Sequence, residues 1–341
     1  MMADLRIGVV GTGAIGRTHI ERINTRLQGA KVIGCADANI DFCKSVAEKY
    51  DIRAYNSGEE MINDPEIDAV ICTTIDAFHE QYVMAAIKAE KPVFCEKPLA
   101  PKADACKRIV DAEMATGKHL VQVGFMRRYD AGYKQIKAAI DSGEYGAPLL
   151  LHCAHRNPSV AVDWTNSSAV ENSMIHEIDT LRWLVGENYT SAEVRYGRDS
   201  RHTGNDADGK FVHDPQIMIL TTESGIRIDV ESYVHNCNNY EIRCEVVCED
   251  AVLNLPEPPS ITVTAKGAKI RDIDKDWSTR FTDAYNEEIQ QWIYTTKEGK
   301  VEGPTAWDGY VAQITALSAS KARDTQTIVS IDIPEKPEFY K

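Results

Sequence analysis

The chain has 341 residues, a length that suits about two domains. Its composition is 43% hydrophobic, 26% charged and 8% aromatic, which excludes collagen-like, disordered and small disulfide-bonded classes. Because 38 Lys+Arg stand against 52 Asp+Glu, the net charge is −14, and the average surface repels phosphate backbones and anionic lipid headgroups. We therefore expect no nucleic-acid partner and no membrane partner.

Two further features bear on location. No apolar run reaches the ~18 residues of a membrane span, and no secretory signal pattern opens the chain. The nine cysteines are odd in number, scattered, and partly set in apolar runs such as residues 93–95, which is typical of buried free thiols in a reducing compartment. These observations predict a cytoplasmic protein.

The first third of the chain alternates short β-type runs with helical patterns, as βαβ units of a parallel sheet do. It predicts one doubly wound α/β domain over residues 1–125. The expected strands are 5–10, 31–36, 69–73, 93–95 and 120–123, and the expected helices are 15–26, 40–49, 77–89 and 102–116.

A G-x-G-x-x-G motif follows the first expected strand directly, where a helix should begin. It comprises Gly11, Thr12, Gly13, Ala14, Ile15 and Gly16. In a dinucleotide site such glycines permit a tight turn and close approach of the backbone to the pyrophosphate. Asp37 ends the second strand, where an acceptor for the ribose 2′-hydroxyl is expected, and no Arg or Lys follows to offset its charge. The pattern favours NAD over NADP; the alternative is a glycine turn followed by a surface aspartate.

Glu96-Lys97-Pro98 stands at the carboxyl end of the strand at residues 93–95, the edge where open α/β sheets bind ligands. A lysine there can donate to a substrate oxygen and stabilise developing negative charge. The alternative is an ordinary solvated lysine.

From about residue 147 longer β-type runs follow one another without helices between them, which favours an antiparallel sheet in a second α+β domain over 126–341. The expected strands are 148–155, 215–222, 225–234, 240–247 and 261–264; the expected helices are 171–185 and 277–297, and 198–213 is an expected surface loop.

The expected helix at 171–185 carries Asn172, His176 and Asp179, whose spacing places them on one α-helical face. Histidine is the natural proton acceptor for alcohol oxidation near neutral pH, although an isolated helical histidine is more often structural. His152 and His155 are close enough in the sequence to suggest a metal site, but on a strand their side chains would point to opposite faces. We therefore expect no metal site.

Together these residues are similar to the glucose-fructose oxidoreductase and inositol dehydrogenase (Gfo/Idh/MocA) family, and most of all to its bacterial inositol-oxidising members. The motifs that carry the resemblance are the glycine motif, Glu96-Lys97-Pro98, the H-x-x-D of residues 176–179, and the stretches 121–130, 152–157 and 303–309. The resemblance implies a Rossmann domain, a second domain with a large open sheet, commonly a homotetramer, and oxidation of a ring alcohol of a cyclitol by NAD, with myo-inositol going to its 2-keto product.

The resemblance also implies roles for single residues. Lys97 would bridge substrate and nicotinamide, and His176 would relay the proton. The remaining implied residues are Thr73, Thr74, His79 and Glu96 for the cofactor and Arg127, His155, Asn157, Tyr240 and Tyr285 for the polyol.

One position departs from the family pattern, because Asn172 stands where an aspartate is common four residues before the histidine. An amide can hydrogen-bond but has no charge to stabilise an imidazolium. Either Glu171 or Asp179 contributes instead, or turnover is impaired, or the residue was engineered. Related activities on scyllo-inositol, sugars or dihydrodiols, and a non-catalytic NAD-binding regulator, remain the alternative functions.

Overall fold

A computed structural model describes residues 3–160 and 164–341. The chain groups into two compact units: unit 1 holds the residues up to Met126 with Tyr285–Gln313 and Pro334–Lys341, and unit 2 holds Arg127–Ala284 and Ile314–Ile333. Two segments that the sequence analysis assigned to the second domain, 285–313 and 334–341, thus group with unit 1.

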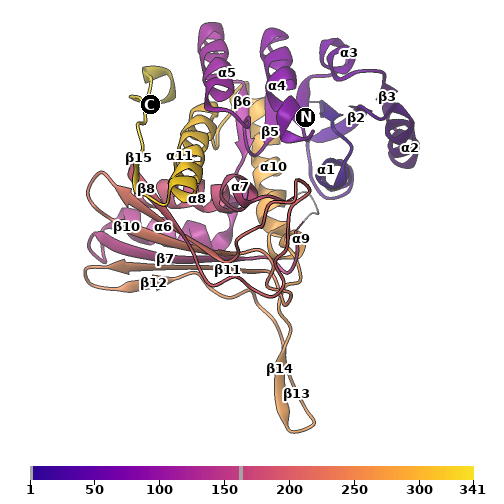
Figure 1. Cartoon of the computed structure of the whole chain (residues 1–341). Helices are drawn as coiled ribbons and strands as arrows, with labels where there is room; N and C mark the ends of the chain where they lie inside the picture. Colours follow the sequence, from indigo (N-terminus) through magenta and orange to yellow (C-terminus); the bar gives the residue numbers. More distant parts are fainter. Residues whose placement is uncertain (1–2, 161–163) are drawn as a thin grey trace. The chain divides into compact units, whose positions relative to one another are not determined.

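Unit 1 is built on a six-stranded parallel sheet of order β3-β2-β1-β4-β5-β6, the fold that the sequence predicts (Figure 1). Its strands are β1 Leu5–Val10, β2 Ala30–Ala36, β3 Arg53–Tyr55, β4 Ala69–Cys72, β5 Val93–Glu96 and β6 Val121–Gly124. Strand β3 was not predicted, because its three residues are too few to show an alternating pattern.

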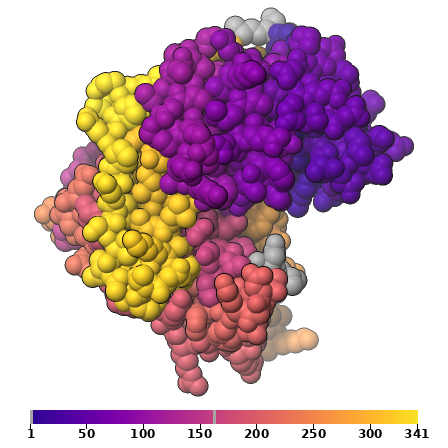
Figure 2. Space-filling model, turned by 45° about the horizontal axis from the view of Figure 1, so that its top comes forward, coloured from indigo at the N-terminus to yellow at the C-terminus, as the bar shows by residue number. Residues whose placement is uncertain are grey.

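The helices of unit 1 are α1 Ala14–Thr25, α2 Ile40–Tyr50, α3 Gly58–Asn63, α4 His79–Lys88 and α5 Ala103–Thr116. Helix α10 (Thr282–Lys297) adds Ile289, Trp292 and Ile293 to the core formed by Ile7 and Phe94. This apolar contact explains why the segment groups with unit 1 rather than with the second sheet. In Figure 2 the N-terminal residues, coloured indigo to purple, form one continuous body.

Unit 2 is built on a seven-stranded sheet of order β12-β11-β7-β10-β9-β8-β15. Its strands are β7 Pro148–Arg156, β8 Tyr189–Tyr196, β9 Gln216–Thr222, β10 Arg227–Tyr233, β11 Glu241–Cys248, β12 Val252–Asn254 and β15 Val329–Ser330. The sheet is antiparallel except that β7 and β10 pair in parallel, so it is mainly but not wholly of the expected kind. Strand β8 and the short strands β12 and β15 were not predicted.

The expected strand at 261–264 belongs to neither large sheet, which corrects that prediction. Residues Thr262–Ala265 (β13) pair only with Ala268–Arg271 (β14) in a two-stranded hairpin, and every residue of the two strands is exposed. The hairpin projects from the rest of unit 2 (Figure 1). Alternation of side chains on a hairpin resembles that of a sheet strand, so the pattern alone could not assign its partner.

The helices outside the Rossmann sheet also differ in detail from expectation. They are α6 Ala131–Ser142, α7 Asn166–Ser168, a π-helical segment Ala169–Met174, α8 Ile175–Val185, α9 Trp277–Arg280 and α11 Ala306–Thr325. The expected helix at 277–297 is therefore interrupted at Phe281, between α9 and α10. Helices α6 and α11 were not predicted. Among the described residues, none of the helices combines the length and apolarity that crossing a membrane requires.

All nine cysteines are free thiols in the structure, and eight of them are buried, Cys237 being the exposed one. On β7 the side chain of His152 is exposed and that of His155 is buried, so the two histidines do point to opposite faces.

Candidate functional site

The glycine-rich loop joins β1 to α1 through very close backbone contacts. Gly11 has φ +94°, and its N–H donates to the Ala36 carbonyl at 2.8 Å. A Cβ on Gly11 would lie 2.5 Å from the Thr73 carbonyl oxygen, and a Cβ on Gly16 would lie 2.1 Å from the Gly11 carbonyl oxygen. Glycine is therefore required at both positions by the fold itself.

The middle of the loop is open. Gly13 is exposed and forms the N-cap of α1, and a Cβ there would meet no described atom within 4 Å. No described side chain caps this helix end, so its first N–H groups and the positive end of the helix dipole face the space above Gly13. Ala14 is also exposed, whereas Thr12 is buried. This cradle fits a dinucleotide pyrophosphate.

Asp37 lies beside this loop at the end of β2. Its Oδ2 accepts from the Thr12 N–H at 2.7 Å and from the Thr12 hydroxyl at 2.9 Å, and its Oδ1 accepts from the Asn39 N–H at 2.9 Å. Because a carboxylate offers about four acceptor positions, these bonds fix its orientation and leave room for a ribose hydroxyl. The side chain is half-buried, as a ligand-facing carboxylate would be.

Thr73, Thr74 and His79 hold the ends of neighbouring strands together. The Thr73 hydroxyl donates to the Gly11 carbonyl at 2.7 Å, which ties β4 to the glycine loop. His79 is buried, with Nδ1 2.6 Å from the Pro98 carbonyl oxygen and Nε2 3.1 Å from the Thr74 carbonyl oxygen. These residues thus build the wall of the expected cofactor site.

Glu96, expected at the cofactor, contacts a buried histidine of α1. His19 Nε2 lies 2.9 Å from Glu96 Oε1, and Arg22 donates to His19 Nδ1 at 2.7 Å. Because Nδ1 accepts, Nε2 carries the proton that is donated to Glu96, and burial lowers the pKa of His19. Tyr285, expected at the polyol, packs here as well, with its ring 5.9 Å from the His19 ring and 5.1 Å from the Arg22 guanidinium.

Lys97 directly follows β5 and is half-buried, at the carboxyl end of the parallel strands. This is the edge at which ligands of open parallel sheets bind. The same edge carries the glycine loop after β1, Asp37 after β2 and Thr73 after β4, so unit 1 gathers its predicted site residues along one edge.

Unit 2 contains a buried charged cluster of Arg127, Glu177 and His155. Arg127 is fully buried and its Nη1 donates to Glu177 Oε1. Glu177 Oε2 lies 3.0 Å from His155 Nδ1, and Arg127 Nη2 lies 3.3 Å from the same nitrogen. Burial alone would raise the pKa of Glu177, but Arg127 and His155 lower it to about 2.

The cluster fixes the orientation of the His155 ring. The shorter contact of Nδ1 is with a carboxylate that remains ionised, so Nδ1 carries the proton and donates it to Glu177. The ring lies edge-on to Tyr240 at 5.9 Å and 6.4 Å from the ring of His176. His155, Tyr240 and His176, all expected at the site, thus lie together in unit 2.

Asn157 follows β7 in the same region. Its N–H donates to the Tyr233 carbonyl at 3.0 Å and its carbonyl accepts from the Asn236 N–H at 3.1 Å, which fix the backbone. Its side-chain Oδ1 is buried, and no residue in the described part of the chain donates to it. A buried amide oxygen of this kind is an acceptor suited to a ligand hydroxyl.

His176 lies in the first turn of α8 and is 8% exposed, whereas Asn172 lies in the π-helical segment before it. The π-helix bonds i to i+5, so the α-helical spacing used to align Asn172 with His176 does not apply across this junction. That Asn172 shares a face with His176 therefore stays a prediction, while His176 and Asp179 do lie within one turn of α8.

The carboxylates expected to assist His176 have structural partners. Arg128 donates to Asp179 through two bonds of 2.8 and 2.5 Å, and Asp179 is 2% exposed. The Ser320 hydroxyl donates to Glu171 at 2.6 Å, and burial raises the pKa of Glu171. Asp179 therefore anchors α8 to the segment after β6, a positioning role.

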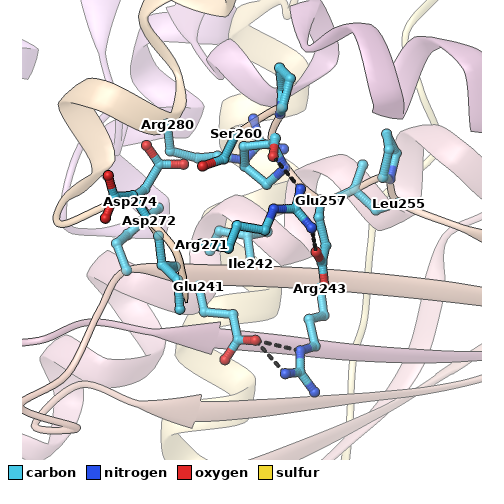
Figure 3. Close-up of a pocket in the computed structure, with 15 residues that line it drawn as sticks. Glu241, Ile242, Arg243, Leu255, Glu257, Ser260, Arg271, Asp272, Asp274 and Arg280 are labelled. Carbon is cyan, nitrogen blue, oxygen red and sulfur yellow. Dashed lines mark hydrogen bonds and ion pairs between the residues drawn. The ribbon is translucent and has the colours of Figure 1, made fainter. Parts of the chain in front are cut away.

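A separate pocket of about 370 Å³ opens on unit 2 beside Tyr240. Figure 3 shows its charged lining, in which Arg271 pairs with Glu257 at 2.5 Å and Arg243 pairs with Glu241. Of the predicted site residues only Tyr240 lines it, and the rest of the lining comes from the start of β11, the two segments that flank the β13–β14 hairpin, and Arg280.

Sequence reasoning missed Glu177, the central anion of the cluster. The available signal was a carboxylate next to His176 within the largely apolar run of α8, where burial requires a cationic partner. The partner, Arg127, lies 50 residues earlier in the chain, so the pairing could not be read from spacing.

Comparisons with known proteins agree with this architecture. Residues 5–125 match the family model described as oxidoreductase family, NAD-binding Rossmann fold (GFO_IDH_MocA), and residues 137–331 match its C-terminal alpha/beta domain. Curated relatives include an inositol 2-dehydrogenase of Agrobacterium fabrum, 48% identical over 341 residues, and one of Pseudomonas fluorescens, 46% identical over 340 residues. Both alignments cover 99% of each chain.

A solved structure resembles the whole chain. It is a myo-inositol dehydrogenase from Lactobacillus casei in complex with NAD(H) and myo-inositol, 37% identical, with a TM-score of 0.95 over 99% of this chain and 100% of that one.

Proposed function

The chain belongs to the Gfo/Idh/MocA oxidoreductase family, and on that basis we propose that it oxidises myo-inositol at one ring hydroxyl to the 2-keto product, with NAD as cofactor. It is an NAD-dependent oxidoreductase acting on a cyclitol. The observation that carries this conclusion is the likeness to inositol 2-dehydrogenases over 99% of both chains. The Rossmann cradle described above supports the cofactor.

The proposed chemistry uses one base and one hydrogen-bond donor. His176 takes the proton of the reacting hydroxyl, and the Lys97 ammonium donates to the same oxygen. Negative charge that develops on this oxygen is thus stabilised while the C–H bond breaks. NAD, when bound, supplies the hydride acceptor. The chain's other task is to hold the alcohol carbon in a reactive orientation.

Polar groups of unit 2 support recognition of a ring covered in hydroxyls. Asn157 offers a buried acceptor, and the ionised Glu177 fixes the orientation of the His155 ring. Arg127 is fully buried against Glu177, so we assign it to positioning His155 rather than to direct contact with the polyol. Tyr240 and Tyr285 remain proposed members of the polyol pocket.

Asp37 supports NAD rather than NADP. Its carboxylate can accept from a 2′-hydroxyl and would repel a 2′-phosphate, and its neighbours Ala38 and Asn39 are uncharged.

Initial rates of NADH formation test the proposal directly. The purified chain would be assayed with myo-inositol, scyllo-inositol and D-glucose, each with NAD and with NADP. We expect the highest kcat/KM with myo-inositol and NAD. Preference for scyllo-inositol or glucose would move the assignment to a sibling specificity, and absence of activity on every inositol would overturn it.

The Asn172→Asp variant separates a slow enzyme from a non-catalytic regulator. If Asn172 limits the relay, the aspartate variant has a higher kcat because a carboxylate stabilises the imidazolium form of His176. NAD binding without turnover in both forms would instead support the regulator.

Assembly and location are further proposals. We propose a homotetramer, supported by apolar side chains exposed on strands of the unit 2 sheet: Leu149, Leu150, Ile217 and Val252 are 38–53% exposed. Sedimentation equilibrium gives the mass, and a monomer at micromolar concentration would contradict this. The buried free thiols support a cytoplasmic location, which cell fractionation would test. A role in inositol catabolism rests on the proposed reaction, and growth of a deletion strain on inositol would test it.

A further inference from the structure

Three potential metal ligands converge inside unit 1. Cys72 ends β4, Cys95 lies in β5 and His79 begins α4, and the ligand atoms of these side chains all lie within 4.8 Å of one another. Their exposed fractions are 0%, 0% and 1%. Cys72 and Cys95 are paired in register on the adjacent parallel strands, so their thiols leave the same face of the sheet.

The histidine is oriented as metal-binding histidines usually are. Its Nδ1 lies 2.6 Å from the Pro98 carbonyl oxygen, which fixes the ring by a second-shell hydrogen bond. Its Nε2 lies 3.1 Å from the Thr74 carbonyl oxygen, a bond that a metal would replace. The Thr74 hydroxyl lies 3.7 Å from the Cys72 sulfur and offers a fourth, weaker donor.

We propose that Cys72, His79 and Cys95 form a binding site for one Zn²⁺ ion. Two thiolates and one imidazole suit a borderline-soft cation with tetrahedral preference and not Mg²⁺ or Ca²⁺, which take oxygen ligands. On binding, the two thiols release their protons to solvent, and the neutral imidazole, with its proton on Nδ1, ligates through the lone pair of Nε2.

The site would act on structure rather than on the reaction. Its ligands come from two strands and a helix, and they adjoin Thr73–Thr74 and Glu96–Lys97 in the chain. An ion held there would join the carboxyl ends of β4 and β5 to α4. Because binding favours the folded state, Zn²⁺ would raise the melting temperature of the chain.

Titration with Co²⁺, and then with Zn²⁺, tests the site on the reduced full-length chain after treatment with a chelator. We expect one Co²⁺ per chain, a thiolate-to-metal charge-transfer band in the near ultraviolet, and loss of this band when Zn²⁺ is added. A chain without such a band, or with a visible spectrum typical of octahedral oxygen ligands, would overturn the proposal.

Variants assign the band to these residues. Cys72→Val suits a buried strand position, and Cys95→Ser keeps the size of the side chain; each should weaken Zn²⁺ binding at least about 10-fold and abolish the rise in melting temperature. Cys43→Ser is the matched control, because Cys43 and Cys35 form a second buried thiol pair of unit 1 with sulfurs 3.5 Å apart. The assignment would be contradicted if Cys43→Ser weakened Zn²⁺ binding as much as the other two variants do. It would also be contradicted if both Cys72→Val and Cys95→Ser kept the Zn²⁺ affinity of the parent chain. Circular dichroism spectra recorded without metal show whether either variant is misfolded. If one of them is, the Zn²⁺ affinity of the other variant tests the proposal.

Discussion

The cofactor cradle of unit 1 and the charged cluster of unit 2 are built in opposite ways. The cradle is made of backbone: two glycines packed against carbonyl oxygens, and a third left open beneath a helix N-terminus. The cluster is made of side chains, with a buried guanidinium, carboxylate and imidazole supporting one another. An added side-chain atom is expected to impair ligand binding at a site made of backbone, whereas removal of one charge is expected to destabilise a cluster of buried charges. The following predictions test that contrast.

The largest expected effect is on turnover. His176→Ala should lower kcat with myo-inositol by a factor of about 10² to 10⁴, because the proton of the hydroxyl loses its acceptor. Binding of NAD, followed by fluorescence, should stay within about twofold. His152→Ala, on the exposed face of β7, is the control and should leave both quantities unchanged. A kcat for His176→Ala equal to that of the parent chain would remove His176 from the mechanism.

The next effect is on stability. Glu177→Gln removes the charge that compensates Arg127, and we expect the free energy of unfolding in urea to fall by about 3–5 kcal/mol. The matched control is Glu80→Gln, which breaks an ion pair with Arg108 at the surface and should cost less than about 1 kcal/mol. Equal losses in the two variants would mean that burial adds nothing to the pair.

The same carboxylate predicts a pH dependence. The pKa of Glu177 is lowered from its ordinary 4.5 to about 2, so its contribution to stability is complete above pH 4.5 and is lost as the pH falls towards 2. Urea unfolding at a series of pH values should show a steeper loss of stability in acid for the parent chain than for Glu177→Gln. Parallel curves would contradict the assignment.

A smaller effect separates packing from binding in the glycine loop. Gly13→Ala should leave the melting temperature of the cofactor-free chain unchanged, since the added Cβ meets no described atom within 4 Å. It should nevertheless weaken NAD binding at least about 10-fold, because the methyl group enters the space for the pyrophosphate. Gly16→Ala should lower both the melting temperature and the affinity. Normal NAD affinity in Gly13→Ala would place the pyrophosphate elsewhere.

The smallest expected effect concerns cofactor choice. Asp37→Ala removes the negative charge that would face a 2′-phosphate, so the ratio of kcat/KM for NAD to that for NADP should fall by about 10-fold. Asp41→Ala, a carboxylate of the first turn of α2, controls for the change in net charge. Equal use of both cofactors by the parent chain would refute the role of Asp37.

The cradle could be predicted from the sequence because its parts are local. Residues 11–13 form the turn between β1 and α1, residues 14–16 begin α1, and Asp37 follows β2, so a short motif and one spacing identify them. The alternation of strands and helices likewise predicted the parallel sheet.

The family resemblance named Arg127 and His155, but neither Glu177 nor the pairing of the three charges could be predicted, because the pairing depends on contacts between distant segments. Arg127 follows β6, His155 lies in β7 and Glu177 lies in α8, and no pattern of spacing reports that they meet. Helix α11 was missed for another physical reason: it is buried on nearly all sides and rich in Ala, Ser and Thr, so it lacks the polar face whose contrast with an apolar stripe identifies a surface helix.

The grouping of the chain limits how this protein can be made or redesigned. The polypeptide passes between the two units after Met126, Ala284, Gln313 and Ile333, so neither unit is a contiguous segment. During synthesis on a ribosome, the Rossmann core therefore stays incomplete until Ile289, Trp292 and Ile293 have emerged. A gene fragment that ends at residue 125 would leave the apolar surface around Ile7 and Phe94 in water, and exchanging domains with a relative requires grafting three segments together.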